Sequence, residues 1–95
     1  MLSVRLLVWD SWNVAHIARH DVAPEEVEEV CHGEPVTSGT DKGRLRVVGP
    51  TGNGRMLTVI LAPAHRAGVY YPVTARPADR KERRNYTQQI NEDAP

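Results

Sequence analysis

The sequence has one cysteine, Cys31, and no apolar run approaching the ~18 residues that a membrane-spanning helix needs. One cysteine excludes an internal disulfide and is typical of a reducing cytoplasm. The N-terminal apolar stretch reaches Asp10 too early for a secretory signal peptide. With 40% apolar and 25% charged residues, residues 1–95 are expected to form one soluble cytoplasmic domain that has no membrane partner.

The sequence also lacks net charge, but its two halves differ strongly. Residues 1–43 hold three basic and eight acidic residues, a net charge of −5. Residues 44–95 hold nine basic and four acidic residues, a net charge of +5. Such asymmetry indicates a polyanionic partner for the basic half and a separate use for the acidic half. The alternative is that the two halves attract each other within the fold.

Hydrophobic periodicity predicts an α+β fold, in which two N-terminal helices and one C-terminal helix accompany an antiparallel sheet of four (three to five) strands. The expected strands are 4–9, 44–48, 56–62 and 69–74, and the expected helices are 10–20, 24–33 and a third that begins near 80. The apolar, β-branched run 56–62 is the expected central strand. Residues 34–42 are either a weak strand or a mobile loop, and the tail from about residue 91 is expected to be disordered.

The glycine-rich segment Gly49–Met56 nearly matches a phosphate-binding P-loop. Arg55 stands where that motif needs lysine, and Met56 stands where a hydroxyl would hold magnesium. The residues that follow favour a strand, so no helix N-terminus would meet a phosphate there. We therefore interpret Gly49–Gly54, which includes Asn-Gly, as a hairpin turn.

Thr74–Tyr86 is the most unusual segment, because it holds five of the twelve Lys and Arg residues in thirteen positions. Pro77 has no amide hydrogen for a strand ladder, and Asp79 can cap a helix that starts at Arg80. Cations in the first turn of that helix oppose its macrodipole and cost stability. This composition indicates a partner that carries phosphate.

Arginine is the candidate functional residue type, since the planar guanidinium matches phosphate oxygens. In the expected sheet, seven arginines can converge on one concave side: Arg44, Arg46, Arg55, Arg76, Arg80, Arg83 and Arg84. The alternative is an ordinary solvated basic surface. A glycine–serine–glycine nucleophile elbow and a glycosidase-like acid pair are both absent, and Cys31 is expected to face the core and be inert.

His16 and His20 lie one helical turn apart, a spacing that allows two imidazoles to bind one metal ion. A third ligand at a recognisable spacing is missing, so neither a metal nor another cofactor is expected. With Trp9 and Trp12, the two histidines are instead interpreted as an amphipathic edge that leaves His20 free for acid–base or phosphate chemistry.

Several short motifs resemble those of BrnT-type toxins, in the same order. Val8-Trp9-Asp10 followed by Asn13, and Ala18-Arg19-His20-Asp21-Val22, resemble their opening segment, with Asp21 in place of the usual glycine. Pro24–Val30 resembles their second helix, and Arg44-x4-Gly49 with Gly54-Arg55-x-Leu57-x-Val59 resembles their hairpin. Thr74-Ala75-Arg76-x3-Arg80-x-Glu82-Arg83-x2-Tyr86 resembles their closing segment.

The resemblance implies a RelE-like fold, cleavage of mRNA without a cofactor, and growth arrest. It also implies neutralisation by a co-encoded antitoxin that carries a ribbon-helix-helix DNA-binding domain, so that operator DNA is bound only through the antitoxin. The acidic residues 21–34 are a candidate contact for a basic segment of that antitoxin.

Under this hypothesis the RNA 2′-hydroxyl attacks the adjacent phosphate and leaves a cyclic phosphate. Arg44 and Arg76 are expected at the phosphate, Arg80 at the RNA backbone, and His20 and Tyr86 are expected to move protons. The expected RNA-binding residues are Arg46, Arg55, Arg83 and Arg84. The alternative function is a module that binds RNA or the antitoxin and has no chemistry of its own.

Overall fold

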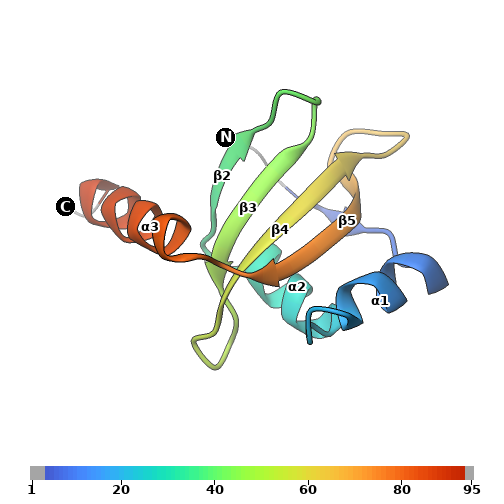
Figure 1. Cartoon of the computed structure of the whole chain (residues 1–95). Coiled ribbons are helices and arrows are strands. Elements are labelled where there is room, and N and C mark those ends of the chain that lie inside the picture. The colour runs from blue at the N-terminus through green and yellow to red at the C-terminus, as the bar shows by residue number, and fades with distance from the viewer. Residues whose placement is uncertain (1–3, 94–95) are drawn as a thin grey trace.

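A five-stranded sheet and three helices make up the computed structural model, which describes residues 4–93 (Figure 1). The strands are β1 (Leu6–Leu7), β2 (Val36–Gly39), β3 (Leu45–Pro50), β4 (Met56–Pro63) and β5 (Val69–Pro77). The helices are α1 (Ser11–Ala18), α2 (Pro24–His32) and α3 (Arg80–Asp93). The predicted α+β class, with two N-terminal helices and one C-terminal helix, is confirmed.

The strand order is β1-β5-β4-β3-β2, which makes β4 the central strand, as the sequence predicts. Strands β2 to β5 pair antiparallel, whereas β1 runs parallel to β5. The prediction of a purely antiparallel sheet is corrected for this pair. β1 is shorter than expected because Asp10 already caps α1, so the chain leaves the sheet edge after Val8.

β2 is a strand, which decides between the two alternatives for residues 34–42. Its backbone pairs with β3 from Val36 opposite Val48 to Gly39 opposite Leu45. Three of its four residues are exposed. Backbone hydrogen bonds to β3, rather than burial of its own side chains, therefore hold this edge strand in place.

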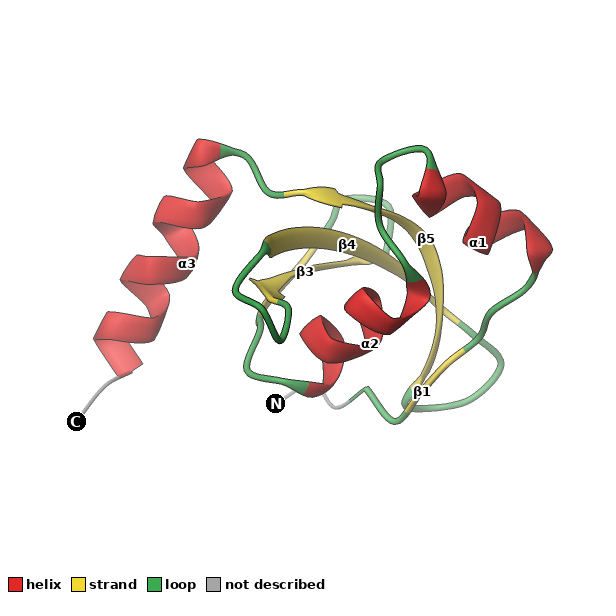
Figure 2. Ribbon diagram, turned by 90° about the horizontal axis from the view of Figure 1, so that it is seen from below, coloured by secondary structure: helices red, strands yellow, loops and turns green. Residues whose placement is uncertain are grey.

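One face of the sheet is covered by α1 and α2, and it forms the core (Figure 2). Val47, Leu57 and Val59 alternate along their strands and are fully buried. The helices contribute a buried stripe that consists of Ile17, Val27, Val30 and Cys31. Burial raises the pKa of the Cys31 thiol to about 12, which leaves it protonated and inert, as expected.

The turn between α1 and α2 contains the one non-glycine residue with a positive φ among the described residues, Asp21 at 60°. Asp21, which stands in place of the usual glycine after His20, thus adopts the left-handed conformation that glycine commonly supplies at a helix end. Ala23, which offers no side-chain cap to α2, donates its amide instead to Glu26 Oε1 at 3.0 Å. This hydrogen bond is the main reason that the pKa of Glu26 lies below its usual value.

α3 lies apart from the other two helices, beside β2 and β3 (Figures 1 and 2). Residues 91–93, where the sequence predicts a disordered tail, continue this helix. The segment has no glycine or proline before Pro95 that would end the helix earlier. Residues 94 and 95 lie outside the described part. None of the described helices has the length and apolar character to cross a membrane.

Candidate functional site

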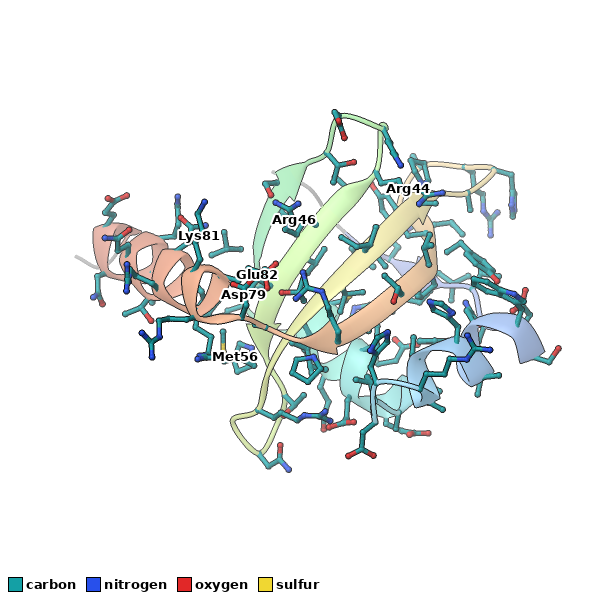
Figure 3. The ribbon with its side chains drawn as sticks, in the orientation of Figure 1. Arg44, Arg46, Met56, Asp79, Lys81 and Glu82 are labelled. Atoms are coloured by element: carbon teal, nitrogen blue, oxygen red, sulfur yellow. The ribbon has the colours of Figure 1, made fainter. Side chains whose placement is uncertain are left out.

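A groove of about 570 Å³ lies between the open face of the sheet and α3, and we call it the α3 groove. It is lined by Val36, Ser38, Arg46, Val48, Arg76, Asp79, Lys81, Glu82, Arg84, Asn85 and Gln88. Figure 3 shows Asp79 and Glu82 between α3 and the sheet, and Arg46 on β3 facing the same side. Segments more than thirty residues apart in sequence thus build one site.

Two periodicities bring these side chains together. On the strands, Arg46 lies opposite Ser38, and Arg76 lies opposite Thr58, so both arginines point away from the core face. On α3, the lining residues follow the spacing i, i+3, i+4 and i+7 that places side chains on one helical face: Lys81, Arg84, Asn85 and Gln88. The groove is therefore formed by one face of the sheet and one face of the helix.

A bidentate ion pair fixes the floor of the α3 groove. The Arg76 guanidinium donates to both carboxylate oxygens of Glu82, at 2.8 and 2.9 Å. This hydrogen bond is the main reason that the pKa of Glu82 falls to about 2, and it raises the pKa of Arg76. Glu82 also accepts the Asp79 amide at 2.9 Å, while Asp79 Oδ1 accepts the Glu82 amide at 2.8 Å. These hydrogen bonds connect the end of β5 to the start of α3.

The charge of the groove lining is positive. Four cations, Arg46, Arg76, Lys81 and Arg84, face two carboxylates. Both carboxylates are already engaged, Glu82 by Arg76 and Asp79 by the helix cap. No side chain of the described residues forms an ion pair with the other three cations. The groove therefore has a net charge of +2 and offers, beside a fixed guanidinium, three cations without an ion-pair partner among the described residues.

Of the other arginines proposed for the site, Arg80 and Arg83 lie on α3 but outside the groove lining. Arg83 donates to the carbonyl of Ala78, just before the start of α3, at 2.6 Å. Arg44 precedes β3 at its far end, is exposed, and lies away from α3 (Figure 3). Arg80 is exposed at the first position of the helix.

Arg55 does not join the other arginines, and the prediction that all seven converge is wrong at this position. Its guanidinium donates to both oxygens of Glu26, at 3.1 and 3.2 Å, and to the carbonyl of Asp21 at 2.7 Å. Glu26 belongs to α2, which covers the core face of the sheet. Arg55 follows the hairpin turn and therefore reaches back to the helices instead of forward to the groove.

The two candidate proton-transfer residues also lie outside the groove lining. His20 is exposed after the end of α1, with its ring 6.1 Å from that of His16. Tyr86 donates its hydroxyl to the carbonyl of Glu34 at 2.9 Å, an interaction that joins α3 to the loop before β2. Burial, followed by the charge of Glu34, raises the pKa of Tyr86, which keeps the phenol protonated.

Sequence reasoning missed Lys81 and Glu82 as groove residues. The helical spacing from Lys81 to Gln88 was a usable signal, because it marks one polar face. The pairing of Arg76 with Glu82 gave no such signal, since it depends on how the loop at Pro77 and Ala78 turns the helix. Trp9 likewise leaves the expected edge of α1 and donates to Glu28 at 2.9 Å.

Among residues 4–93, no group of three or more His, Cys, Asp or Glu side chains is arranged to hold a metal ion. The sequence matches no protein-family model and no curated protein.

Proposed function

We propose that this chain is an RNA-directed toxin of the BrnT type with a RelE-like fold, and that it cleaves RNA in the α3 groove without a metal ion. The observation that supports this proposal is the set of three unpaired cations, Arg46, Lys81 and Arg84, beside the fixed guanidinium of Arg76. Four positive groups within one groove suit consecutive phosphates of a single strand.

Cleavage would proceed by attack of the 2′-oxygen on the adjacent phosphorus. The new P–O2′ bond forms as the P–O5′ bond breaks, leaving a 2′,3′-cyclic phosphate and a 5′-hydroxyl. A base accepts the 2′-hydroxyl proton, and the departing 5′-oxygen takes a proton from water. The negative charge that develops on the phosphorane is stabilised by the groove cations, foremost Arg76.

Glu82 is the carboxylate in position to act as the base in this scheme. With its pKa held at about 2 by Arg76, it is a weak base in the free protein. A phosphate that enters the groove competes with Glu82 for the Arg76 guanidinium. Loss of that hydrogen bond returns the pKa of Glu82 toward its ordinary value, so substrate binding itself would activate the base.

A binding module without catalysis is the second candidate, and one observation favours it. The titratable groups of the lining are arginines, a lysine and two carboxylates, and Glu82 is strongly acidic. His20 and Tyr86, the side chains expected to transfer protons, lie outside it. In this reading RNA, or a segment of the antitoxin, occupies the groove and remains intact.

Incubation of the purified protein with RNA in EDTA separates the two candidates. The appearance of cyclic-phosphate ends supports the enzyme, and intact RNA that remains bound supports the module. We expect Arg76→Ala to reduce cleavage by about 10²- to 10³-fold, as the loss of one preorganised donor does elsewhere. Arg66→Ala, an exposed arginine in the β4–β5 turn, serves as the matched control and should cleave normally.

Glu82→Gln tests the proposed base. The amide keeps the size of the side chain but cannot accept the proton, so RNA binding should persist while cleavage falls by about 10²-fold or more. A folded Arg76→Ala variant that cleaves at the full rate would contradict the assignment of the phosphate site.

The proposed partners are the RNA substrate and a co-encoded antitoxin whose ribbon-helix-helix domain binds operator DNA. An antitoxin segment that covers the α3 groove would exclude RNA directly, because both need the same cations. The protein would act in the cytoplasm and arrest growth when the antitoxin is lost. Arg46→Ala should weaken this competition, and because Arg46 is exposed the substitution should leave the fold intact.

A further inference from the structure

Three ring side chains, two on α1 and one in the turn that follows it, lie next to one another, and we call them the α1 stack: Trp12, His16 and His20. Trp12 and His16 follow the spacing i and i+4, which places them on one side of the helix, and His20 continues the row beyond the helix end. The ring centroids of Trp12 and His16 are 4.8 Å apart with an interplanar angle of 7°, so these rings stack face to face. The next ring, His20, meets His16 edge-on. Trp12 nevertheless remains 56% exposed.

The helix that carries the α1 stack is firmly held. Asp10 and Asn13 form a reciprocal capping box, with both hydrogen bonds at 2.9 Å. The buried side-chain amide of Asn13 also donates, through Nδ2, to the carbonyls of Val8 and Pro72, at 3.0 and 3.1 Å. Ile17 anchors the opposite side of the helix in the core. The aromatic row is thus presented by a fixed element, so a ligand would not have to order it.

A shallow hollow of about 480 Å³ adjoins the stack, and its charge is positive. Its lining consists of Ser11, Trp12, Ala15, His16 and Arg19. This lining contains no carboxylate, although the first 43 residues hold eight acids. The nearest acid in sequence, Asp10, is engaged by the Asn13 amide and by the Tyr71 hydroxyl at 2.9 Å.

We propose that the α1 stack is a platform for an unpaired nucleobase of single-stranded RNA, with Arg19 at the adjoining phosphate. A flat, exposed indole suits the face of any base, and a neighbouring guanidinium suits the backbone. The platform rests on the proposed function and extends its RNA-binding surface. α1 lies beside β5 and α3 lies beside β2 and β3, near opposite edges of the sheet (Figure 1). One strand would run from the α3 groove across the open face of the sheet and around its β1–β5 edge to Trp12.

Binding of a ten-nucleotide 2′-O-methyl oligonucleotide tests the platform, because this probe has no 2′-hydroxyl to attack its phosphates. We expect Trp12→Ala to weaken binding by about tenfold or more, the usual effect of losing one stacked base. Trp12→Phe should restore most of the affinity. Val14→Ala removes another exposed apolar side chain of α1, two residues away on a different side, and should bind like the parent protein.

An abasic oligonucleotide of equal length and charge separates stacking from electrostatic attraction. The parent protein should bind it about tenfold more weakly than the probe with bases, whereas Trp12→Ala should barely distinguish the two. In a Trp9→Phe background, the fluorescence of Trp12 should change on binding of the normal probe but not of the abasic one.

The platform is overturned if Trp12→Ala binds the normal probe as tightly as the parent, or if bases make no difference to the parent. It is also overturned if Trp12→Ala leaves RNA binding unchanged but converts a dimer to a monomer in analytical ultracentrifugation. The same holds if the variant leaves RNA binding unchanged but no longer binds anionic vesicles. The groove is tested separately with Arg46→Ala and Arg84→Ala. If these two variants bind normally while Trp12→Ala does not, the proposed function fails and the platform stands.

Discussion

The role of Arg55 is decided by the groups that it contacts and not by its residue type alone. In sequence it is one of seven arginines that fit a phosphate site, and it follows a glycine-rich turn. In the structure its guanidinium joins β4 to Glu26 of α2 and to the carbonyl of Asp21 in the helix–helix turn. Both partners precede it by about thirty residues, and no local pattern announces them.

We predict that Arg55→Ala destabilises the protein by about 1–3 kcal/mol, because it leaves the half-buried Glu26 carboxylate without its partner. Urea unfolding measures this loss. Arg44→Ala, which removes an exposed arginine, should change stability by less than about 0.5 kcal/mol. If Arg55→Ala has unchanged stability and binds RNA poorly, Arg55 is an RNA-binding residue and not a structural one.

Because of Glu82, the ion pair of the α3 groove should make the free energy of unfolding depend on pH. Its pKa in the folded protein is about 2, against an ordinary value of 4.5. A depressed folded-state pKa contributes stability that is complete above 4.5 and is lost as the pH falls toward 2. We predict that the parent protein loses about 1–2 kcal/mol more than Glu82→Gln between pH 6 and pH 2.5, a figure lowered for the solvent exposure of Arg76.

Urea unfolding of both proteins at the two pH values measures this difference. Asp10 and Glu26 also have lowered pKa values, so both proteins will lose some stability in acid, and only their difference reports on Glu82. Parallel pH profiles for the parent and Glu82→Gln would show that the ion pair does not form in solution.

At the scale of elements, α3 is unusual because little apolar surface holds it. Ile90, an apolar side chain of this helix, remains 37% exposed. Tyr86 is half-buried and donates to the carbonyl of Glu34. The helix is therefore attached by polar contacts at two points, the Arg76–Glu82 pair at its start and Tyr86 in its middle.

We predict that Tyr86→Phe loosens α3 without unfolding the sheet. Loss of one hydrogen bond costs about 1 kcal/mol, which should speed amide exchange along the helix by about fivefold. Hydrogen exchange of backbone amides measures the effect, with the β4 amides as the internal reference. Tyr71→Phe, which removes a hydroxyl bonded to Asp10 on the far side of the molecule, should leave α3 exchange unchanged.

The elements were predictable where burial is periodic. Val47, Leu57 and Val59 face the core at every second position of their strands, and the i, i+3, i+4 pattern of Val27, Val30 and Cys31 marks α2. β1 and β2 carried weaker signals, since one spans two residues and the other is mostly exposed. Their place depends on hydrogen bonds to neighbouring strands, which a local window does not contain.

The candidate site was predictable in part for the same reason. Arg46, Arg76 and Arg84 do line the α3 groove, because strand alternation and the spacing of residues along α3 place them there. The positions of Tyr86 and Arg83 were not predictable, since they depend on the angle at which α3 leaves β5. That angle is set by the Arg76–Glu82 pair and the Asp79 cap together.

At the scale of the whole molecule, the fold keeps the two charges apart instead of neutralising them. Among the described residues, the Arg55–Glu26 pair is the only Lys or Arg ion pair that joins the acidic half to the basic half. The acids of α2 lie behind the core face, and the groove cations lie on the other side of the sheet. Mutual attraction of the halves therefore explains little of the uneven charge distribution.

This separation predicts salt-dependent RNA binding by a protein of zero net charge. At physiological ionic strength charges interact over about 8 Å, so the acids behind the sheet hardly screen the groove. Each cation that contacts a single-stranded phosphate contributes about 0.7 to the slope of log affinity against log salt. The double variant Arg46→Ala/Arg84→Ala should therefore reduce the magnitude of that slope by about 1.4, measured with the 2′-O-methyl probe.

Glu25→Gln, on the exposed side of α2, should leave the slope unchanged. Equal slopes for the double variant and the parent would mean that RNA contacts a different surface, because removing two groove cations cannot otherwise leave the number of released counterions intact.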